Sequence, residues 1–146
     1  MMLKIKKLNE NAIIPKAATG GSAGMDLYAC LENDITIKPG ERTLVSTGIA
    51  IALPDNSYVA YIYARSGLAI KNGITLSNCV GVVDSDYRGE VKVGLINLSD
   101  SDYTVSNGDR IAQMVIAPVI IPQIEEVEEL DETERADGGF GSTGKK

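Results

Sequence analysis

Histidine is absent from this 146-residue chain, as is tryptophan, and there are only two cysteines, Cys30 and Cys79. Without histidine, every Ser-His-Asp or Cys-His mechanism of covalent catalysis is excluded. Because the two cysteines stand far apart, a tetrahedral zinc site built from cysteine and histidine within one chain is excluded as well. If the protein is an enzyme, we therefore expect its general base to be a carboxylate.

Long apolar runs are also missing. No segment approaches the ~18 residues needed to cross a membrane. The lysine-rich start, MMLKIKKLNE, is not followed by the apolar stretch of a signal peptide. Nothing in the sequence resembles the basic face that binds long nucleic acids. We therefore expect a cytoplasmic protein with neither a membrane nor a nucleic acid as partner.

The net charge of −6 is concentrated near the C-terminus. Residues 123–146 carry eight acidic and three basic side chains, whereas residues 1–122 carry 12 and 11. This distribution predicts one domain with three parts, namely a body over 1–122, an acidic linker over 123–134 and a C-terminal arm over 135–146. The arm has no hydrophobic periodicity but is rich in side chains that grip ligands. We expect it to be flexible alone and to order on a ligand or a neighbouring subunit.

Short runs rich in valine and isoleucine alternate with turn signals such as Pro39-Gly40 and Asn72-Gly73. The clearest runs are ITIKPGERTLVSTGIAIALP, YVAYIYA, EVKVGLINL and DRIAQMVIAPVIIP. No stretch of 11 or more residues has a convincing helical period, and a short helical turn is expected only near residues 66–72. The pattern predicts an all-β fold, either a barrel or a double-sheet roll.

The segment GVVDSDYRGE, residues 81–90, is the most informative one inside the body. It begins as a strand, and Gly81 and Gly89 bracket a hairpin-like segment. Asp84 and Asp86 are two residues apart, so on a strand they would share one face. The segment alone fits an ordinary hairpin tip with solvated aspartates. It also fits a site in which Asp84 meets a water molecule or a metal.

Three further segments carry chemistry that is weak when each is taken alone. ARSGLA (64–69) follows a strand and can present a guanidinium, a hydroxyl and backbone N–H groups to a phosphate. GDRIAQM (108–114) places Arg110 and Gln113 in an otherwise apolar run. AGMDL (23–27) holds Asp26 within a strand of small residues. Ordinary turns and edge strands would explain each of these segments equally well.

Together with RADGGFGSTG (135–144), these four segments stand in the order and spacing of the five motifs of the trimeric deoxyuridine triphosphatases (dUTPases). The chain resembles that family from about residue 23 to residue 144. It departs from the usual pattern at Ala64, where proline or glycine is common, and at Ala136, where glycine is common. Neither departure removes a functional side chain.

The resemblance implies an all-β, jelly-roll-like β-barrel of the dUTPase-like β-clip type, with a flexible C-terminal arm that closes the active site. It implies a homotrimer with shared active sites and Mg²⁺-dependent hydrolysis of dUTP to dUMP and pyrophosphate. That activity limits uracil in DNA and supplies dUMP for thymidylate synthesis.

The resemblance also implies roles for individual residues. Asp84 matches the catalytic aspartate that activates water, and Asp26 would order water around Mg²⁺ in its second shell. Tyr87 would lie under the deoxyribose, and Phe140 would stack on uracil. The full set of implied substrate contacts is Arg65, Ser66, Gly67, Asn78, Val82, Val83, Tyr87, Lys92, Gln113, Arg135, Phe140, Gly141, Ser142 and Thr143.

Two alternatives remain open at this point. The first is deamination of dCTP on the same scaffold, with a glutamate as base. The second is a regulatory protein that uses the same surface to bind a partner protein. The single aspartate of VVDSDY and the complete glycine-rich tail favour hydrolysis over deamination.

Overall fold

The structure, a computed structural model, describes residues 1–139. Within these residues it has eleven strands and one short helix. The strands are β1 (Lys4–Lys7), β2 (Met25–Tyr28), β3 (Ile35–Ile37), β4 (Arg42–Ser46), β5 (Ile49–Ala52), β6 (Tyr58–Tyr63), β7 (Ile74–Leu76), β8 (Gly81–Val83), β9 (Lys92–Asn97), β10 (Tyr103–Val105) and β11 (Arg110–Pro118). The helix α1 spans Ser66–Asn72, where the sequence predicted a helical turn. The all-β prediction is confirmed.

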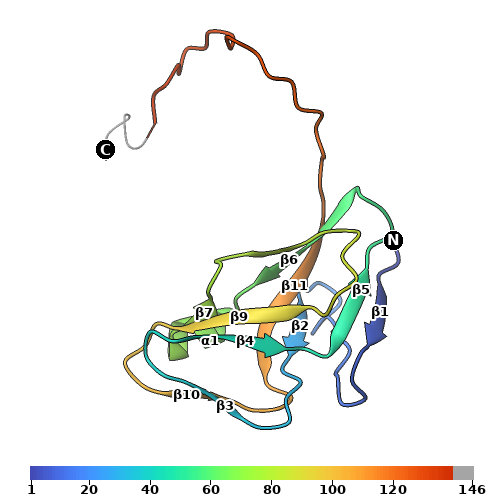
Figure 1. Ribbon diagram of the computed structural model, residues 1–146, viewed down its shortest axis with the longest axis vertical. Helices are drawn as coiled ribbons and strands as arrows, with labels where there is room; N and C mark the ends of the chain where they lie inside the picture. The colour runs from blue at the N-terminus through green and yellow to red at the C-terminus, as the bar shows by residue number, and fades with distance from the viewer. Residues whose placement is uncertain (140–146) are drawn as a thin grey trace.

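The longest strand, β11, organises the largest sheet, whose strand order is β2-β11-β6-β8. All neighbours in this sheet are antiparallel. A second sheet has the order β4-β9-β7, and two further pairs join β1 to β5 and β3 to β10. Figure 1 shows these sheets wrapped around a common interior. No helix within residues 1–139 is long and apolar enough to cross a membrane.

The core lies between the two larger sheets. Leu27 of β2 and Met114 of β11 enter it from one sheet, and Val45 of β4 and Leu95 of β9 enter it from the other; all four are fully buried. The short valine-rich runs predicted antiparallel strands of this kind, in which buried residues on one face alternate with polar residues on the other. The packing of two sheets over one core agrees with the expected jelly-roll-like architecture.

The prediction of a hairpin-like segment over residues 81–90 is wrong about which strands pair. β8 does not pair with the strand that follows it, because Gly81–Val83 aligns with Ile62–Ala60 of β6 instead. The next strand, β9, pairs with β4 and β7 in the other sheet. Residues 84–91 therefore cross from one sheet to the other. A local turn signal cannot reveal this, because the partners of both strands are distant in sequence.

The C-terminal segment leaves the body after β11. The amide of Val119 donates to the carbonyl of Ser57 at 2.9 Å, the last backbone hydrogen bond to the body among residues 1–139. From there the chain runs outward in an extended course (Figure 1). Backbone pairing with the body, among residues 1–139, thus ends just after β11.

Asn97 is the largest polar side chain that the fold buries completely. Its amide nitrogen donates to the carbonyls of Ile37 and Ser101, both at 2.8 Å. Its amide oxygen accepts from the amide of Ser99 at 2.9 Å and from the Ser99 hydroxyl at 2.7 Å. Asn97 therefore fastens the loop after β9 to β3. The same loop packs against the end of α1, where a side chain at Gly73 would meet Ser99.

We predict that Asn97→Ala lowers the free energy of unfolding by about 2–4 kcal/mol, because it leaves the buried carbonyl of Ile37 and backbone groups of Ser99 and Ser101 without these partners. Urea unfolding followed by circular dichroism measures this change. Asn56→Ala serves as the control, since Asn56 is exposed. Equal stability of the two variants would contradict the role given to Asn97.

Candidate active site

A cavity of about 330 Å³ lies beside β8, and we call it the β8 cavity. It is formed where the loop after β8 crosses toward β9, so both large sheets contribute to its walls. Six of the residues that the sequence singled out line it together: Asn78, Val82, Val83, Asp84, Tyr87 and Lys92. The structure thus gathers one part of the expected site in one place.

Asp84 follows the last residue of β8 and is exposed at the β8 cavity. Within residues 1–139 its carboxylate has no hydrogen-bond or ion-pair partner, so its lone pairs are free to accept from a ligand or a water. Asp86 lies in the following turn and lines a neighbouring cavity with Tyr58 and Tyr61, and Asp84 borders that cavity too. Of the two aspartates, Asp84 is the one that lines the β8 cavity.

Tyr87 is held in place by its own loop. Its amide donates to the carbonyl of Asp84 at 3.2 Å, and its hydroxyl donates to the carbonyl of Glu90 at 3.0 Å. The ring lies directly against the backbone of Gly89, because a Cβ at that position would overlap the ring. Glycine at 89 thus allows the aromatic ring to lie close to the backbone of the loop that carries Asp84.

Glu90 is a residue of this site that the sequence reasoning missed. One carboxylate oxygen accepts from the amide of Gly48 at 2.8 Å, and the other lies 3.4 Å from the Lys92 ammonium. Glu90 therefore fixes the end of the loop to the turn before β5 and orients Lys92. Its position beside the Gly89 turn was visible in the sequence, but its partner at position 48 is too distant to infer.

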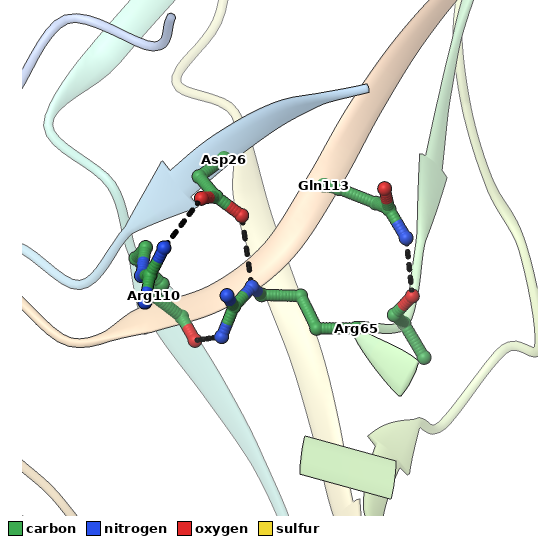
Figure 2. Close-up of polar contacts among 5 residues, drawn as sticks. Asp26, Arg65, Arg110 and Gln113 are labelled. Atoms are coloured by element: carbon green, nitrogen blue, oxygen red, sulfur yellow. Dashed lines mark hydrogen bonds and ion pairs between the residues drawn. The ribbon is translucent and has the colours of Figure 1, made fainter. Parts of the chain in front are cut away.

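A second group of expected residues forms a charged cluster at the start of β11 (Figure 2). The Asp26 carboxylate accepts from Arg65 Nε at 2.8 Å and from Arg110 Nη1 at 3.2 Å. Arg65 Nη1 also donates to the backbone carbonyl of Arg110 at 3.3 Å. Two guanidinium groups thus share one carboxylate, which leaves a net positive charge that suits an anion.

A β-bulge in β11 places Arg110 in this cluster. Arg110 aligns with Tyr28, Ala112 aligns with Leu27, and Gln113 aligns with Asp26, so Ile111 is an extra residue on β11. In a regular strand, residues three apart point to opposite faces. The extra residue brings Arg110 and Gln113 to the same face as Asp26. The sequence reasoning noted Arg110 but assigned it no role, because a bulge cannot be read from the apolar pattern.

Gln113 connects the cluster to the residues that precede α1. Its amide nitrogen donates to the carbonyl of Ala64 at 2.9 Å (Figure 2). A side chain at Gly24 would collide with the Gln113 amide, so the small residue there is needed for close approach. Arg65, Ser66, Gly67 and Gln113 border one cavity of about 410 Å³, which we call the cationic cavity.

Tyr103 borders the other side of Arg65 and Arg110. Burial is the main reason that the pKa of its hydroxyl is raised, and the nearby Asp109 acts in the same direction, while Arg65 acts against them. The phenol therefore stays neutral at physiological pH and adds no negative charge to the cluster.

The β8 cavity and the cationic cavity have no lining residue in common. Arg135 borders neither cavity. Its Nε donates within its own turn to the carbonyl of Gly138 at 2.9 Å. Ala136 in this turn has φ of 46°, the left-handed conformation that glycine adopts most easily. The remaining expected contacts, Phe140, Gly141, Ser142 and Thr143, lie outside the described residues.

The donor set bears on which metal the site fits. Among residues 1–139 there is no cluster of three or more cysteine, aspartate or glutamate side chains that could enclose a metal ion. Both carboxylate oxygens of Asp26 already accept from arginines. This arrangement fits a hard cation that takes its ligands from a substrate and from water, with protein carboxylates outside the first shell, as Mg²⁺ often does.

Comparison with known proteins agrees with this geometry. The family model described as dUTPase matches residues 10–144. The deoxyuridine 5'-triphosphate nucleotidohydrolase of Finegoldia magna is 57% identical over 143 residues, which covers 97% of this chain and 99% of that protein. The enzyme of the same name from a Hydrogenobaculum species is 55% identical over 146 residues and covers 100% of both chains.

Solved structures agree as well. The dUTPase of Staphylococcus bacteriophage 80alpha, solved as a point mutant with dUpNHpp, superimposes with a TM-score of 0.89 at 26% identity and covers 98% of each chain. The sequence motifs, the fold and the family match concur over nearly the whole length. The chain therefore belongs to the dUTPase family.

Proposed function

We propose that the chain hydrolyses dUTP to dUMP and pyrophosphate in the cytoplasm, with Mg²⁺ bound to the triphosphate. One observation carries the proposal: this member of the dUTPase family has a carboxylate at one cavity and a pair of arginines at another. Asp84, whose carboxylate has no partner within residues 1–139, lines the β8 cavity, and a cluster of two arginines with net positive charge lies at a separate cavity. These features suit a nucleoside and a triphosphate, respectively.

In the proposed reaction Asp84 orients a water molecule and accepts its proton as the water attacks the α-phosphorus. The bond from the α-phosphorus to the oxygen that bridges to the β-phosphate breaks, and pyrophosphate leaves. The exposed position of Asp84 at the end of β8 supports this role, because the carboxylate needs no rearrangement to reach a bound nucleotide.

The nucleoside is assigned to the β8 cavity. The Asn78 amide and the backbone of Val82 and Val83 would read uracil, and the fixed ring of Tyr87 would pack under the deoxyribose. A rigid ring that leaves no room for a 2′-hydroxyl discriminates by overlap. Lys92 borders this cavity and is oriented by Glu90, so we place it near the α-phosphate.

The phosphates are assigned to Arg65, Ser66, Gly67 and Gln113 in the cationic cavity. When bound, Mg²⁺ supplies charge neutralisation on the phosphate oxygens. Asp26 would accept from water at the edge of that ion while it holds Arg65 and Arg110 in place. Preorganised donors of this kind stabilise the charge that develops on phosphate oxygens in the transition state.

A complete site requires more than one chain in this proposal, as in a homotrimer with shared active sites. The supporting observation is that the two cavities share no lining residue and that the arm leaves the body. The β8 cavity of one copy would face the cationic cavity of a second. Arg135, Phe140, Gly141, Ser142 and Thr143 would come from the arm of a third, with Phe140 on uracil and with Arg135, Ser142 and Thr143 on the γ-phosphate. We propose no nucleic acid or membrane as partner.

Incubation of the protein with Mg²⁺ and either dUTP, UTP, dCTP or dTTP tests the proposed function directly. We expect pyrophosphate to be released rapidly from dUTP and slowly from the other three nucleotides. Mass spectrometry of the products detects dUMP, and it would also detect deamination of dCTP. Absence of pyrophosphate from dUTP would contradict the proposal, and dUTP formed from dCTP would replace it with a deaminase.

We predict that Asp84→Asn lowers kcat for dUTP by ~10²–10⁴, because the amide keeps the shape but accepts no proton. Binding of the non-hydrolysable dUpNHpp, measured by calorimetry, should persist. Asp86→Asn is the matched control, since Asp86 lies two residues away but does not line the β8 cavity. A larger loss of kcat in the Asp86 variant would contradict the assignment of Asp84 as the base.

A second prediction concerns sugar selection. Gly89→Ala adds a methyl group that overlaps the Tyr87 ring, so the ring must move. We expect the ratio of kcat/KM for dUTP over UTP to fall by about tenfold or more, which corresponds to about 1.4 kcal/mol of lost discrimination. Gly20→Ala serves as the control because its added Cβ meets open space. An unchanged ratio would show that Tyr87 does not select the sugar.

A further inference from the structure

Arg110 is the residue of the charged cluster to which the sequence assigned no role. It borders both the cationic cavity and a second cavity of about 300 Å³, which Tyr103 and Asp109 also border. The Arg110 side chain is 51% exposed, whereas the side chains of Asp26 and Arg65 are 17% and 26% exposed. Arg110 therefore stands at the outer edge of the cluster, and its two partners are more enclosed.

Arg65 is held by two contacts, and both depend on residue 110 (Figure 2). Arg65 Nη1 donates directly to the backbone carbonyl of Arg110 at 3.3 Å. Arg65 Nε donates to one oxygen of Asp26 at 2.8 Å, and Arg110 Nη1 donates to the other oxygen at 3.2 Å. The terminal torsion of an aspartate is broad, so a carboxylate that is bound at one oxygen alone can turn. The contact from Arg110 therefore keeps the Asp26 carboxylate aligned with Arg65.

The backbone that carries Arg110 is itself fixed. Directly before it, the carbonyl of Asp109 accepts from the amide of Ala29 at 2.8 Å. Directly after it, the bulge residue Ile111 is almost completely buried. A slip of β11 by one residue would turn Ile111 outward, so burial fixes the register on this side. The Arg110 carbonyl is therefore a fixed acceptor.

The two contacts leave Arg65 with donors to spare. A guanidinium has five N–H groups, and Arg65 uses two of them within residues 1–139. Three remain for an anion in the cationic cavity, which Arg65 lines. The positive charge of Arg110 offsets the negative charge of Asp26, so the charge of Arg65 is not cancelled locally. A side chain that is already oriented loses little conformational freedom when it binds.

We propose that Arg110 is a positioning residue that holds the Arg65 guanidinium ready for the β- and γ-phosphates of the substrate. Its side chain acts through the Asp26 carboxylate, and its backbone acts through the carbonyl that accepts from Arg65. Arg110 does not bind the phosphates itself, because its side chain donates to Asp26 at the more exposed edge of the cluster. This inference rests on the proposed function, since it takes a nucleoside triphosphate as the ligand.

Binding of dUpNHpp and of dUMP, measured by calorimetry, tests the positioning role. Arg110→Met keeps the backbone carbonyl but removes the guanidinium, so the Asp26 carboxylate can turn away from Arg65. We expect dUpNHpp to bind about tenfold more weakly, because one long side chain must then be ordered on binding. Binding of dUMP, which lacks the β- and γ-phosphates, should stay within about twofold. Arg110→Lys should recover most of the lost affinity, because an ammonium also donates to a carboxylate.

Arg42→Met is the matched control, because Arg42 is exposed at the start of β4 and lines neither of the cavities that Arg110 borders. It removes the same charge from the chain. An equal loss of dUpNHpp affinity in the two variants would show that net charge alone matters, and it would overturn the positioning role. An equal loss of dUMP and dUpNHpp affinity in Arg110→Met would also overturn it, since the defect would then lie in the fold.

A double-mutant cycle with Asp26→Ala separates positioning from direct binding. If the Arg110 side chain acts through Asp26, adding Arg110→Met to Asp26→Ala should weaken dUpNHpp binding by about twofold or less. If Arg110 touches the phosphates itself, the same addition should cost the full factor seen in the wild-type background, and the positioning role is wrong.

Hydrolysis of dUTP is followed on the same preparations. A wild-type protein that does not hydrolyse dUTP overturns the proposed function. A wild-type protein that hydrolyses dUTP, together with an Arg110→Met variant that binds dUpNHpp as tightly as the wild type, overturns the positioning role alone.

Discussion

The antiparallel pairing of β11 with both β2 and β6 is the interaction on which the candidate site depends. At Gln113 the strand faces Asp26 on one side and Tyr63 on the other. Through its bulge, β11 delivers Arg110 to the cationic cluster, and through β6 it supports β8 and hence Asp84. Ile111, Ala112 and Met114 are almost completely buried, which fixes the register, because a slip by one residue would turn these side chains outward.

The fold separates two kinds of chemistry that one nucleotide needs. The β8 cavity has apolar walls and one carboxylate that finds no partner in the described part of the chain, whereas the cationic cavity has arginines held by Asp26. Hydrogen bonds within each half hold Tyr87, Glu90 and Arg65 before any ligand arrives. Two preformed cavities on separate surfaces favour association of chains as the way to complete a site. When surfaces of this kind come together, few additional side chains lose conformational freedom.

Much of this arrangement could be predicted from the sequence, and the exceptions have one physical cause. The all-β fold, the short helix at residues 66–72 and the gathering of Asn78, Asp84, Tyr87 and Lys92 followed from local patterns and from the family motifs. The pairing of β8 with β6, the bulge at Ile111 and the bond from Gly48 to Glu90 did not. Each of these joins residues distant in sequence, and long-range packing rather than local preference decides such contacts.

The central claim is that one chain supplies the β8 cavity and another supplies the cationic cluster. Mixing two inactive variants, Asp84→Asn and Arg65→Ala, tests it most directly, with native mass spectrometry to verify that mixed assemblies form. If the two parts of each site come from different copies, random mixing restores about a quarter of the sites, and activity should reappear well above that of either parent. If each chain contains its own complete site, the mixed assemblies will hydrolyse dUTP no faster than the parents, and the account is wrong.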